Sequence, residues 1–470
     1  MFLTITKMPL GFKCGIEIHQ QTDTHKSEIL LDTLKSIIKP IKKDKGIFFT
    51  PDSVVDFMVG LIDEKILNKK EIYILEPACG MTQFITGIER NRQLLFKRAK
   101  KYGVEINKNI IAHIKESTKQ DNVEIINDDF LLWQTEISFD VVIGNPPYGI
   151  PSLSEHYTIK VDDKTKKIYK KKFTTWYGKY NVYGAFIEKS IQLLKDEGQL
   201  IFITPATFMF LDEFKKLRKF LADNGSTEII YLGENVFPDA DVTSVVLKFV
   251  KTKKSAHKFS LAEFKNHRIL PVKQIAKWKG EIITFETDFT DGLKNISRHR
   301  LGDIYEIRIS PRTPEIKKNY NIVQSKTIAD ENFIPILNGR NLKVNEIIYE
   351  PLIDLWIPKT KIKTLRGYFN KSHIVVGLGF RGNRQIAAAY DKKAYPWIGD
   401  VYHLSRKHNF SVMDMKLSDE EIVAYLNSEV VRKYIMDVFR EVTYHLSITQ
   451  LKQLPVPSNQ EELKNLSKLS

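Results

Sequence analysis

Short apolar segments alternate with helically spaced apolar positions along the first half of the chain. Apolar runs predict strands at residues 71–75, 139–144, 198–204, 229–232 and 244–250, and strand ends at 103–105 and 123–130. Helical spacing predicts helices around residues 54–62 and over 185–194 and 214–224, with Thr50 as the cap of the first. This alternation favours an α/β fold: a doubly wound, mostly parallel sheet with helices on both faces.

The first three predicted strands each end in an acid, namely Glu76, Glu105 and Asp129. In a doubly wound sheet, an acid after the second strand is placed to bind the hydroxyls of a ribose, and one after the third can accept from an adenine amino group. Taken singly, such acids are more often solvated helix caps. S-adenosylmethionine offers both groups together with an activated methyl group, so this interpretation requires no metal ion.

The fourth predicted strand runs directly into Asn145-Pro146-Pro147-Tyr148. Two prolines stiffen the loop, so that an amide, a carbonyl and an aromatic ring are presented at fixed positions. An amino group conjugated to a ring or a carbonyl attacks poorly until oxygens accept both of its N–H bonds. The oxygens of Asn145 and Pro146 are candidates, and they would stabilise the charge that develops as a methyl group arrives. The alternative is a stiff turn after a core strand.

Charged segments divide the chain. Residues 151–180 are polar and lysine-rich, with Trp176, which predicts a long surface loop of functional importance. A charged break at 251–255 predicts a domain boundary. The expected organisation is an N-terminal extension over 1–45, a catalytic domain over 46–252 and a second domain over 253–470.

Composition narrows the class of protein and its location. The chain has 470 residues, of which 42% are hydrophobic and 11% aromatic, an ordinary globular mix that excludes a disordered or fibrous chain. Neither a signal-peptide core nor an apolar run of about 20 residues is present, which predicts a cytoplasmic protein. Cys14 and Cys79 lie far apart, so neither a disulfide framework nor a zinc site is expected.

The net charge of +15 is unevenly distributed. Residues 1–250 hold 35 Lys and Arg against 33 Asp and Glu, a charge of +2, whereas residues 251–470 hold 37 against 24, a charge of +13. A basic second half attached to a near-neutral first half is what a phosphate-backbone ligand requires. Charge alone is weak evidence, since many basic proteins bind no nucleic acid.

Several motifs occur in a fixed order. In the first half they are Phe48-Phe49-Thr50-Pro51, Glu76-Pro77-Ala78-Cys79-Gly80, Tyr102-Gly103-Val104-Glu105, Asp128-Asp129-Phe130-Leu131-Leu132-Trp133, Asn145-Pro146-Pro147-Tyr148-Gly149, Lys179-Tyr180-Asn181-Val182-Tyr183-Gly184-Ala185-Phe186, Pro205-Ala206-Thr207 and Tyr231-Leu232-Gly233-Glu234. In the second half they are Ala394-Tyr395-Pro396-Trp397, Tyr402-His403-Leu404, Leu426-Asn427-Ser428 and Leu451-Lys452-Gln453-Leu454-Pro455. Over residues 46–458 this order resembles that of the adenine-N6 DNA methyltransferases of the gamma motif order, such as the TaqI DNA methyltransferase. The resemblance implies a Rossmann-like S-adenosylmethionine-dependent methyltransferase fold with a C-terminal α+β target-recognition domain.

The resemblance also implies roles for individual residues. Asn145, Pro146 and Tyr148 would be catalytic, and Tyr148 and Phe237 would stack on a flipped adenine. The cofactor S-adenosylmethionine would be bound by Thr50, Glu76, Ala78, Gly80, Glu105, Asp129, Phe130, Asn145 and Phe186. Of these, Thr50 and Glu76 would lie near its methionine part, Glu105 would hold the ribose, and Asp129, Phe130 and Phe186 would surround the adenine. One departure is Thr82, which stands where the family usually has a second glycine and leaves the cofactor affinity open.

The basic second half resembles the target-recognition domain of the same family. Arg381 and Arg384, in an amide-rich segment, and Lys179 in the first half are the candidate DNA contacts, although a solvated loop is equally compatible with the segment. The expected partner is double-stranded DNA, bound by a monomer. A cognate restriction endonuclease would be a second partner.

The sequence therefore predicts a site-specific DNA methyltransferase that flips an adenine and methylates its N6 amine, as part of a restriction-modification system. A protein glutamine-N5 methyltransferase uses the same loop chemistry, but it does not predict a large basic second domain. A fused nuclease would need Pro51-Asp52 and Asp63-Glu64-Lys65 as its signature, and these residues lie within a segment that resembles a cofactor motif. A DNA-binding protein with a decayed cofactor site is disfavoured by Asn145 and Tyr148, whereas Thr82 leaves it open.

Overall fold

The computed structural model describes residues 49–117, 122–153, 159–237, 242–253, 257–311, 316, 320–324, 331–350, 352–365, 367–399, 401–408, 415–441 and 445–468. The predicted N-terminal extension, 1–45, lies outside these residues, as does Cys14. The chain divides into two compact units, one ending at Ile283 and the other beginning at Thr284.

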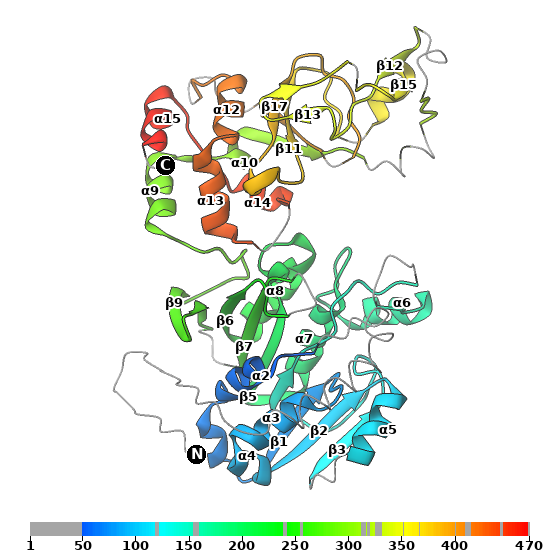
Figure 1. Cartoon of the computed structure of the whole chain (residues 1–470), viewed down its shortest axis with the longest axis vertical. Helices are drawn as coiled ribbons and strands as arrows, with labels where there is room; N and C mark the ends of the chain where they lie inside the picture. Colours follow the sequence, from blue (N-terminus) through cyan, green and yellow to red (C-terminus); the bar gives the residue numbers. More distant parts are fainter. Residues whose placement is uncertain are drawn as a thin grey trace. The chain divides into compact units, whose positions relative to one another are not determined.

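The first unit is built on a nine-stranded sheet with the strand order β3-β2-β1-β4-β5-β7-β6-β8-β9 (Figure 1). The strands are β1 (Ile72–Pro77), β2 (Ala99–Glu105), β3 (Val123–Asn127), β4 (Phe139–Gly144), β5 (Leu194–Pro205), β6 (Gly225–Gly233), β7 (Ser244–Lys251), β8 (Phe259–Lys265) and β9 (Arg268–Ile275). Five neighbouring strands, β3, β2, β1, β4 and β5, pair in parallel in this spatial order. Strand β7 is antiparallel to both β5 and β6. The predicted mostly parallel α/β sheet is therefore confirmed.

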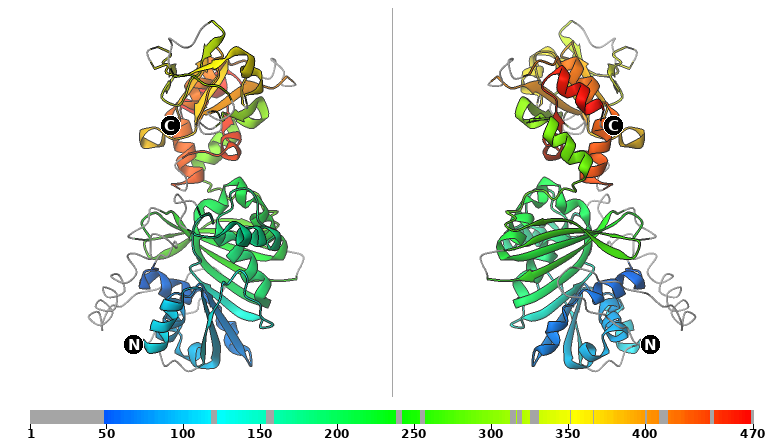
Figure 2. Two further views of the ribbon diagram at one scale, coloured as in Figure 1. Left: turned by 90° about the vertical axis from the view of Figure 1, so that its right-hand side faces the viewer. Right: turned by 90° about the vertical axis from the view of Figure 1, so that its left-hand side faces the viewer.

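Helices cover both faces of this sheet (Figure 2). The helical elements of this unit are α2 (Asp52–Gly60), η1 (Glu64–Asn68), α3 (Gln83–Asn91), α4 (Gln93–Arg98), α5 (Lys108–Ser117), α6 (Asp163–Lys172), α7 (Val182–Leu193), η2 (Ala206–Met209), η3 (Asp212–Phe214) and α8 (Lys215–Asn224). Helix α2 buries Val55, Met58 and Val59. It approaches α3 closely because Gly87 has no Cβ, and a Cβ there would collide with Val55. All six residues of β4 are buried, as its apolar run predicts for a central strand covered on both faces.

Three expectations from the sequence differ from the structure. Strands β8 and β9 lie beyond the charged break and extend the sheet, so the first compact unit continues to Ile283 instead of ending at residue 252. The predicted surface loop over 151–180 contains α6 and buried aromatic side chains, among them Tyr169 and Trp176. The prediction that Thr50 caps the following helix is wrong, because the N-cap of α2 is Pro51 and no side chain caps it.

The second unit combines antiparallel strands with helices, as predicted for an α+β domain. Its four-stranded sheet has the order β11-β18-β16-β17, and three pairs of strands form separate ribbons, β10 with β19, β12 with β15 and β13 with β14. The strands are β10 (His299–Arg300), β11 (Tyr305–Ile309), β12 (Phe333–Pro335), β13 (Leu342–Lys343), β14 (Glu346–Ile347), β15 (Trp356–Pro358), β16 (His373–Gly377), β17 (Ala388–Asp391), β18 (Val401–Arg406) and β19 (Pro455–Val456). The helices are α9 (Asp288–Ile296), α10 (Leu301–Ile304), η4 (Lys359–Thr364), η5 (Gly382–Arg384), α12 (Asp419–Leu426), α13 (Glu429–Phe439), α14 (Ile448–Lys452) and α15 (Gln460–Ser467).

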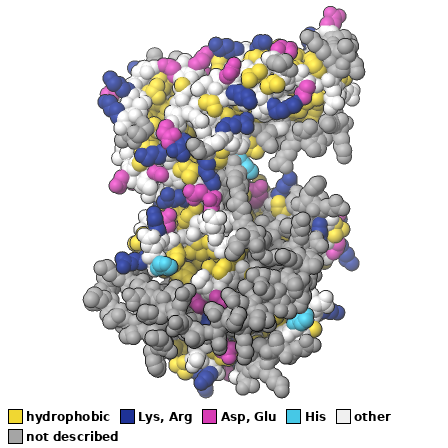
Figure 3. All heavy atoms as spheres, viewed as in Figure 1, with side chains coloured by type: hydrophobic (Ala, Val, Ile, Leu, Met, Phe, Trp, Pro, Cys, Tyr) yellow, Lys and Arg dark blue, Asp and Glu magenta, His cyan; other side chains and the backbone are white. Residues whose placement is uncertain are grey.

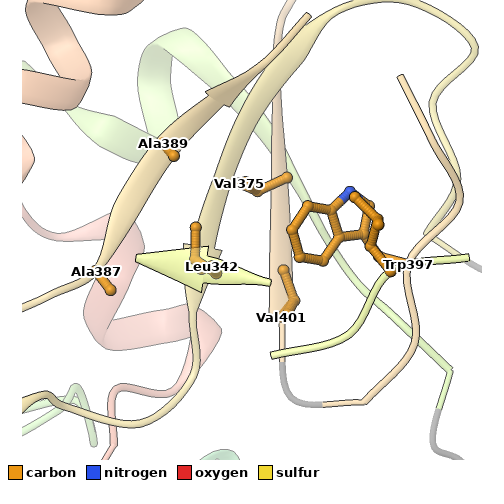
Figure 4. Close-up of a cluster of buried hydrophobic side chains, with 7 residues drawn as sticks. Leu342, Val375, Ala387, Ala389, Trp397 and Val401 are labelled. Carbon is orange, nitrogen blue, oxygen red and sulfur yellow. The ribbon is translucent and has the colours of Figure 1, made fainter. Parts of the chain in front are cut away.

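Trp397 lies in the core of the second unit, among Leu342, Val375, Val401 and two alanines of the β17 region (Figure 4). Its indole Nε1 donates a hydrogen bond of 2.8 Å to Asp391, which satisfies the one polar atom of a fully buried ring. In neither unit do the described residues include a helix with the length and apolar character needed to cross a membrane.

Candidate cofactor and catalytic site

A cavity of about 420 Å³ opens at the carboxyl ends of β1, β2 and β4 in the first unit. Ligand sites of open α/β sheets lie at this edge. All nine residues that the sequence assigns to cofactor binding line the cavity: Thr50, Glu76, Ala78, Gly80, Glu105, Asp129, Phe130, Asn145 and Phe186. The structure thus brings together residues that are far apart in the sequence.

The turn from β1 into α3 forms one wall of the cavity. Ala78, Gly80 and Thr82 all adopt left-handed backbone conformations, with φ of 51°, 50° and 59°. Thr82 therefore has the backbone geometry that a glycine would supply, and its buried side chain donates to the Met81 carbonyl and does not line the cavity. The Thr82 side chain therefore does not narrow the cavity.

Glu76 lies buried at the base of this turn. Its carboxylate accepts hydrogen bonds from the backbone N–H groups of Phe84 and Ile85, at 3.1 and 3.0 Å, in the first turn of α3. Burial raises the pKa of Glu76 to about 8, although these two donors act to lower it. The group is thus poised to gain charge when a cation approaches.

Glu105, at the end of β2, is oriented by the backbone on both sides. One oxygen accepts from the N–H of Gly80 at 3.0 Å, and the other accepts from the N–H of Asn107 at 2.8 Å. The first of these bonds links the end of β2 to the β1–α3 turn. A carboxylate held in this way has a fixed orientation, as recognition of a diol requires.

The opposite end of the cavity is aromatic. The rings of Phe130 and Phe186 lie 5.0 Å apart at an angle of 35°, and both side chains are buried. Asp129 precedes Phe130 and accepts a hydrogen bond from the backbone N–H of Leu131 at 2.9 Å. An acceptor beside two apolar rings matches the requirements of a purine with an exocyclic amine.

The predicted catalytic loop begins where β4 ends, and Asn145, Pro146 and Pro147 line the cavity. Asn145 donates from Nδ2 to the Thr50 hydroxyl at 3.0 Å, a bond that orients the amide. Thr50 is therefore a support for the loop instead of a helix cap. The end of the loop is held as well, because the Gly149 N–H donates to the Asn181 side-chain oxygen at 2.8 Å.

The two predicted stacking residues, Tyr148 and Phe237, are in contact with each other. Their ring centroids are 6.4 Å apart with an interplanar angle of 76°, an edge-to-face arrangement, and both side chains are buried. The Tyr148 hydroxyl donates to the Ile203 carbonyl at 3.0 Å, and burial raises the pKa of this phenol. Neither ring lines the cavity, so a base held between them would require at least one ring to turn.

Sequence reasoning missed several residues of this site. Gln83, at the start of α3, exchanges hydrogen bonds with the backbone of Thr50 in both directions. Asn181 lies in a segment that carries the family resemblance, but no role was assigned to its side chain. Tyr169 of α6 lines the cavity although its segment was expected to be a surface loop. Its spacing of four from Phe173 was the available signal.

The candidate DNA contacts are not among the residues that line the cavity. Lys179 is exposed between α6 and α7. In the second unit, Arg381 donates to the carbonyls of Gly339 and Leu342 at 3.2 and 3.4 Å, so its guanidinium is held against the segment over 339–342. Arg384 is half-buried, with a φ of 60°. Lys and Arg side chains spread over the face of the second unit that is visible in Figure 3.

The charge of the cavity fits a cationic ligand. Its lining includes the carboxyl groups of Glu76, Glu105, Asp128 and Asp129, against one ammonium group, that of Lys160. S-adenosylmethionine, with a sulfonium and an ammonium against one carboxylate, has the complementary charge. The same cavity contains an aromatic end, a carboxylate of fixed orientation and a buried acid.

Two family models match the chain. Residues 63–237 match the Eco57I restriction-modification methylase model, and residues 334–456 match the TaqI-like C-terminal specificity domain. The chain is 38% identical over 408 residues to the type II methyltransferase M.TthHB8I of Thermus thermophilus, covering 86% of this chain and 89% of that protein. It is 27% identical over 324 residues to the modification methylase CviBIII of Paramecium bursaria Chlorella virus NC1A, covering 68% and 72% of the two chains.

Solved structures give matches to the fold over nearly the whole chain. A DrdV–DNA complex has a TM-score of 0.55 at 15% identity, with coverage of 96% of this chain and 60% of that one. A nuclease-deletion mutant of the restriction-modification enzyme LlaGI, in complex with a DNA substrate mimic, has a TM-score of 0.55 at 13% identity, with coverage of 95% and 56%.

Proposed function

Because this chain belongs to the type II DNA methyltransferases of restriction-modification systems, which use S-adenosylmethionine, we propose that it turns an adenine out of the duplex and methylates its N6 amine. The observation that carries the proposal is the Asn145-Pro146 loop at the edge of an acid-lined cavity, with the Asn145 amide oriented by Thr50. Such a loop suits an exocyclic amine, whose nitrogen becomes nucleophilic once oxygens accept its N–H bonds.

In this proposal the Asn145 side-chain oxygen and the Pro146 carbonyl accept the two N–H bonds of the adenine amine. When bound beside this loop, S-adenosylmethionine would supply the methyl group: the nitrogen–carbon bond would form as the carbon–sulfur bond breaks, with S-adenosylhomocysteine as the product. The two oxygens stabilise the positive charge that develops on the nitrogen, an effect that is largest in the transition state. The proton leaves after transfer, when the methylated amine is acidic, so no general base is required.

The cofactor is proposed to lie with its methionine end near Thr50 and Glu76, its ribose at Glu105 and its adenine between Phe130 and Phe186, next to Asp129. The lining of the cavity by all of these residues supports this orientation. Tyr148 and Phe237 would stack on the flipped base once one of the rings turns. Stacking of this kind offsets part of the few kcal/mol that flipping costs.

The second unit is proposed to recognise the DNA sequence. Its match to a specificity domain supports this role, as does its charge of +6, from 28 Lys and Arg against 22 Asp and Glu over residues 284–470. Arg381, Arg384 and Lys179 are proposed contacts to phosphates or base edges. The protein is proposed to act as a monomer on DNA, beside a cognate restriction endonuclease.

The test is transfer of a labelled methyl group from S-adenosylmethionine to mixed-sequence duplex DNA, followed by digestion to nucleosides. We expect label in N6-methyldeoxyadenosine for the wild type and a loss of at least about 1000-fold for Asn145→Ala, since the variant lacks a transition-state contact. Its DNA affinity should remain within about twofold, because no phosphate contact is removed. Label in a cytosine nucleoside, or in the protein fraction alone, would overturn the adenine assignment.

A further inference from the structure

Helix α6 follows the catalytic loop in the chain and contributes Tyr169 to the lining of the cavity. It is drawn at the right of the first unit in Figure 1. The Tyr169 hydroxyl donates a hydrogen bond to Oδ2 of Asp129, forty residues earlier in the chain. Three residues on, Lys172 donates from Nζ to the Leu131 carbonyl at 2.8 Å. Two contacts therefore fasten α6 to the short segment that follows β3.

These contacts determine how the Asp129 carboxylate is oriented. Its Oδ1 accepts from the backbone N–H of Leu131 at 2.9 Å, while its Oδ2 accepts from Tyr169. A carboxylate with one anchored oxygen can rotate about its χ2 bond with little cost, because such torsions are broad. Anchors on both oxygens remove this freedom, so the lone pairs that remain point in set directions.

Tyr169 is itself held firmly. Its side chain is 4% exposed, and its ring lies 6.2 Å from that of Trp176, which in turn lies 5.2 Å from Tyr180. Burial, followed by the charge of Asp129, raises the pKa of the Tyr169 phenol, so the hydroxyl remains a proton donor at any working pH. A rigid neutral donor is well suited to fix an acceptor without cancelling its charge.

We propose that Tyr169 is a positioning residue, which orients Asp129 to accept from the 6-amino group of the cofactor's adenine and so makes the site select adenosine over inosine. The inference rests on the proposed placement of the cofactor adenine at Asp129. Inosine presents a carbonyl where adenosine presents an amine, so the fixed carboxylate would face an acceptor and repel it. Loss of the Tyr169 bond would let the carboxylate turn away and reduce that penalty.

The variant is Tyr169→Phe, which keeps the ring and removes only the hydroxyl. Tyr177→Phe is the matched control, because Tyr177 is an exposed tyrosine five residues after the end of α6. Titration calorimetry on the full-length protein gives dissociation constants for S-adenosylhomocysteine and S-inosylhomocysteine, and thermal unfolding verifies that each variant is folded.

We expect the wild type and Tyr177→Phe to prefer the adenosine ligand by at least about tenfold, the size of one charge-assisted hydrogen bond. In Tyr169→Phe the preference should fall by about fivefold or more, because the adenosine ligand loses a well-aligned acceptor and the inosine ligand is repelled less. The KM for S-adenosylmethionine should rise while kcat stays within about twofold. A structural defect would weaken both ligands equally and leave the preference intact, so that result overturns the inference.

A double-mutant cycle supplies a readout that does not depend on the stability of Tyr169→Phe alone. If Tyr169 acts through Asp129, adding Tyr169→Phe to Asp129→Asn should change the preference by less than about twofold. Additive losses would contradict the inference. If the wild type does not prefer the adenosine ligand over the inosine ligand, both the proposed placement of the adenine and this inference are wrong. If the wild type has the preference and Tyr169→Phe keeps it, only this inference is wrong.

Discussion

The charge of Glu76 should change when the cofactor binds. The carboxyl group is 2% exposed, and its pKa of about 8 follows from burial. At pH 7, a group with this pKa is ionised in about one molecule in ten. A cation that lies beside Glu76 lowers this pKa, because it favours the carboxylate over the neutral acid.

The proposed orientation brings the ammonium of the cofactor's methionine part close to Glu76. Binding at pH 7 should then release close to one proton, about 0.9 per ligand. Acid keeps Glu76 neutral and removes its attraction to the ligand, so affinity must fall as the pH falls below 8. The association constant should rise about tenfold between pH 6 and pH 7, by about fivefold more up to pH 8, and then level off.

Titration calorimetry with S-adenosylhomocysteine measures both quantities, since this ligand retains the ammonium. Affinities are recorded from pH 6 to pH 8, and the proton count comes from buffers of different ionisation enthalpy at pH 7. Glu76→Gln is the control, and it should bind more weakly with little dependence on pH in this range. Equal wild-type affinities at pH 6 and pH 8, or the same slope in Glu76→Gln, would refute the reasoning.

Three further predictions concern other parts of the molecule. Replacing Thr50 by Val should lower kcat about tenfold, because the Asn145 amide loses the hydrogen bond that orients it. The control Thr50→Ser keeps the hydroxyl, so its kcat should stay within about twofold of the wild type. Equal losses of kcat for the two variants in steady-state assays would contradict this role. Thr82→Gly should leave the dissociation constant of S-adenosylhomocysteine within about twofold of the wild-type value, since Thr82 does not line the cavity. A tenfold change would show that the Thr82 side chain does affect cofactor binding. His373 and His403 are hydrogen-bonded to each other at 2.8 Å, and burial lowers the pKa of both. Below about pH 6.5 the unfolded chain binds protons that the folded pair does not, so the free energy of unfolding should fall by roughly 1 kcal/mol or more per pH unit. Denaturant unfolding at pH 7.5 and 5.5 measures this loss, and it should shrink in His403→Gln.

The parts of the fold that follow from short-range patterns were predictable. The apolar run at 139–144 coincides with β4, because a fully buried parallel strand reads as an unbroken hydrophobic segment. The Asn145 loop and the acids at strand ends were recognisable because parallel strands place their carboxyl ends at one edge of the sheet.

The remaining features depend on tertiary contacts that no local pattern reports. Thr50 appeared suited to cap a helix, but its hydroxyl pairs with Asn145, ninety-five residues away. The many lysines of α6 indicated an exposed loop, but the Tyr169 side chain within it is buried and its hydroxyl donates to Asp129. The charged break at 251–255 resembled a boundary because it is polar, yet β8 pairs with β6 beyond it.

The most direct test of the central claim is to express the wild type and Asn145→Ala in a bacterial host without DNA methylation and to read modified bases in the genomic DNA. The account predicts N6-methyladenine at nearly every occurrence of one short sequence for the wild type, and none above background for the variant. N4-methylcytosine, or N6-methyladenine of equal extent in both strains, would contradict it.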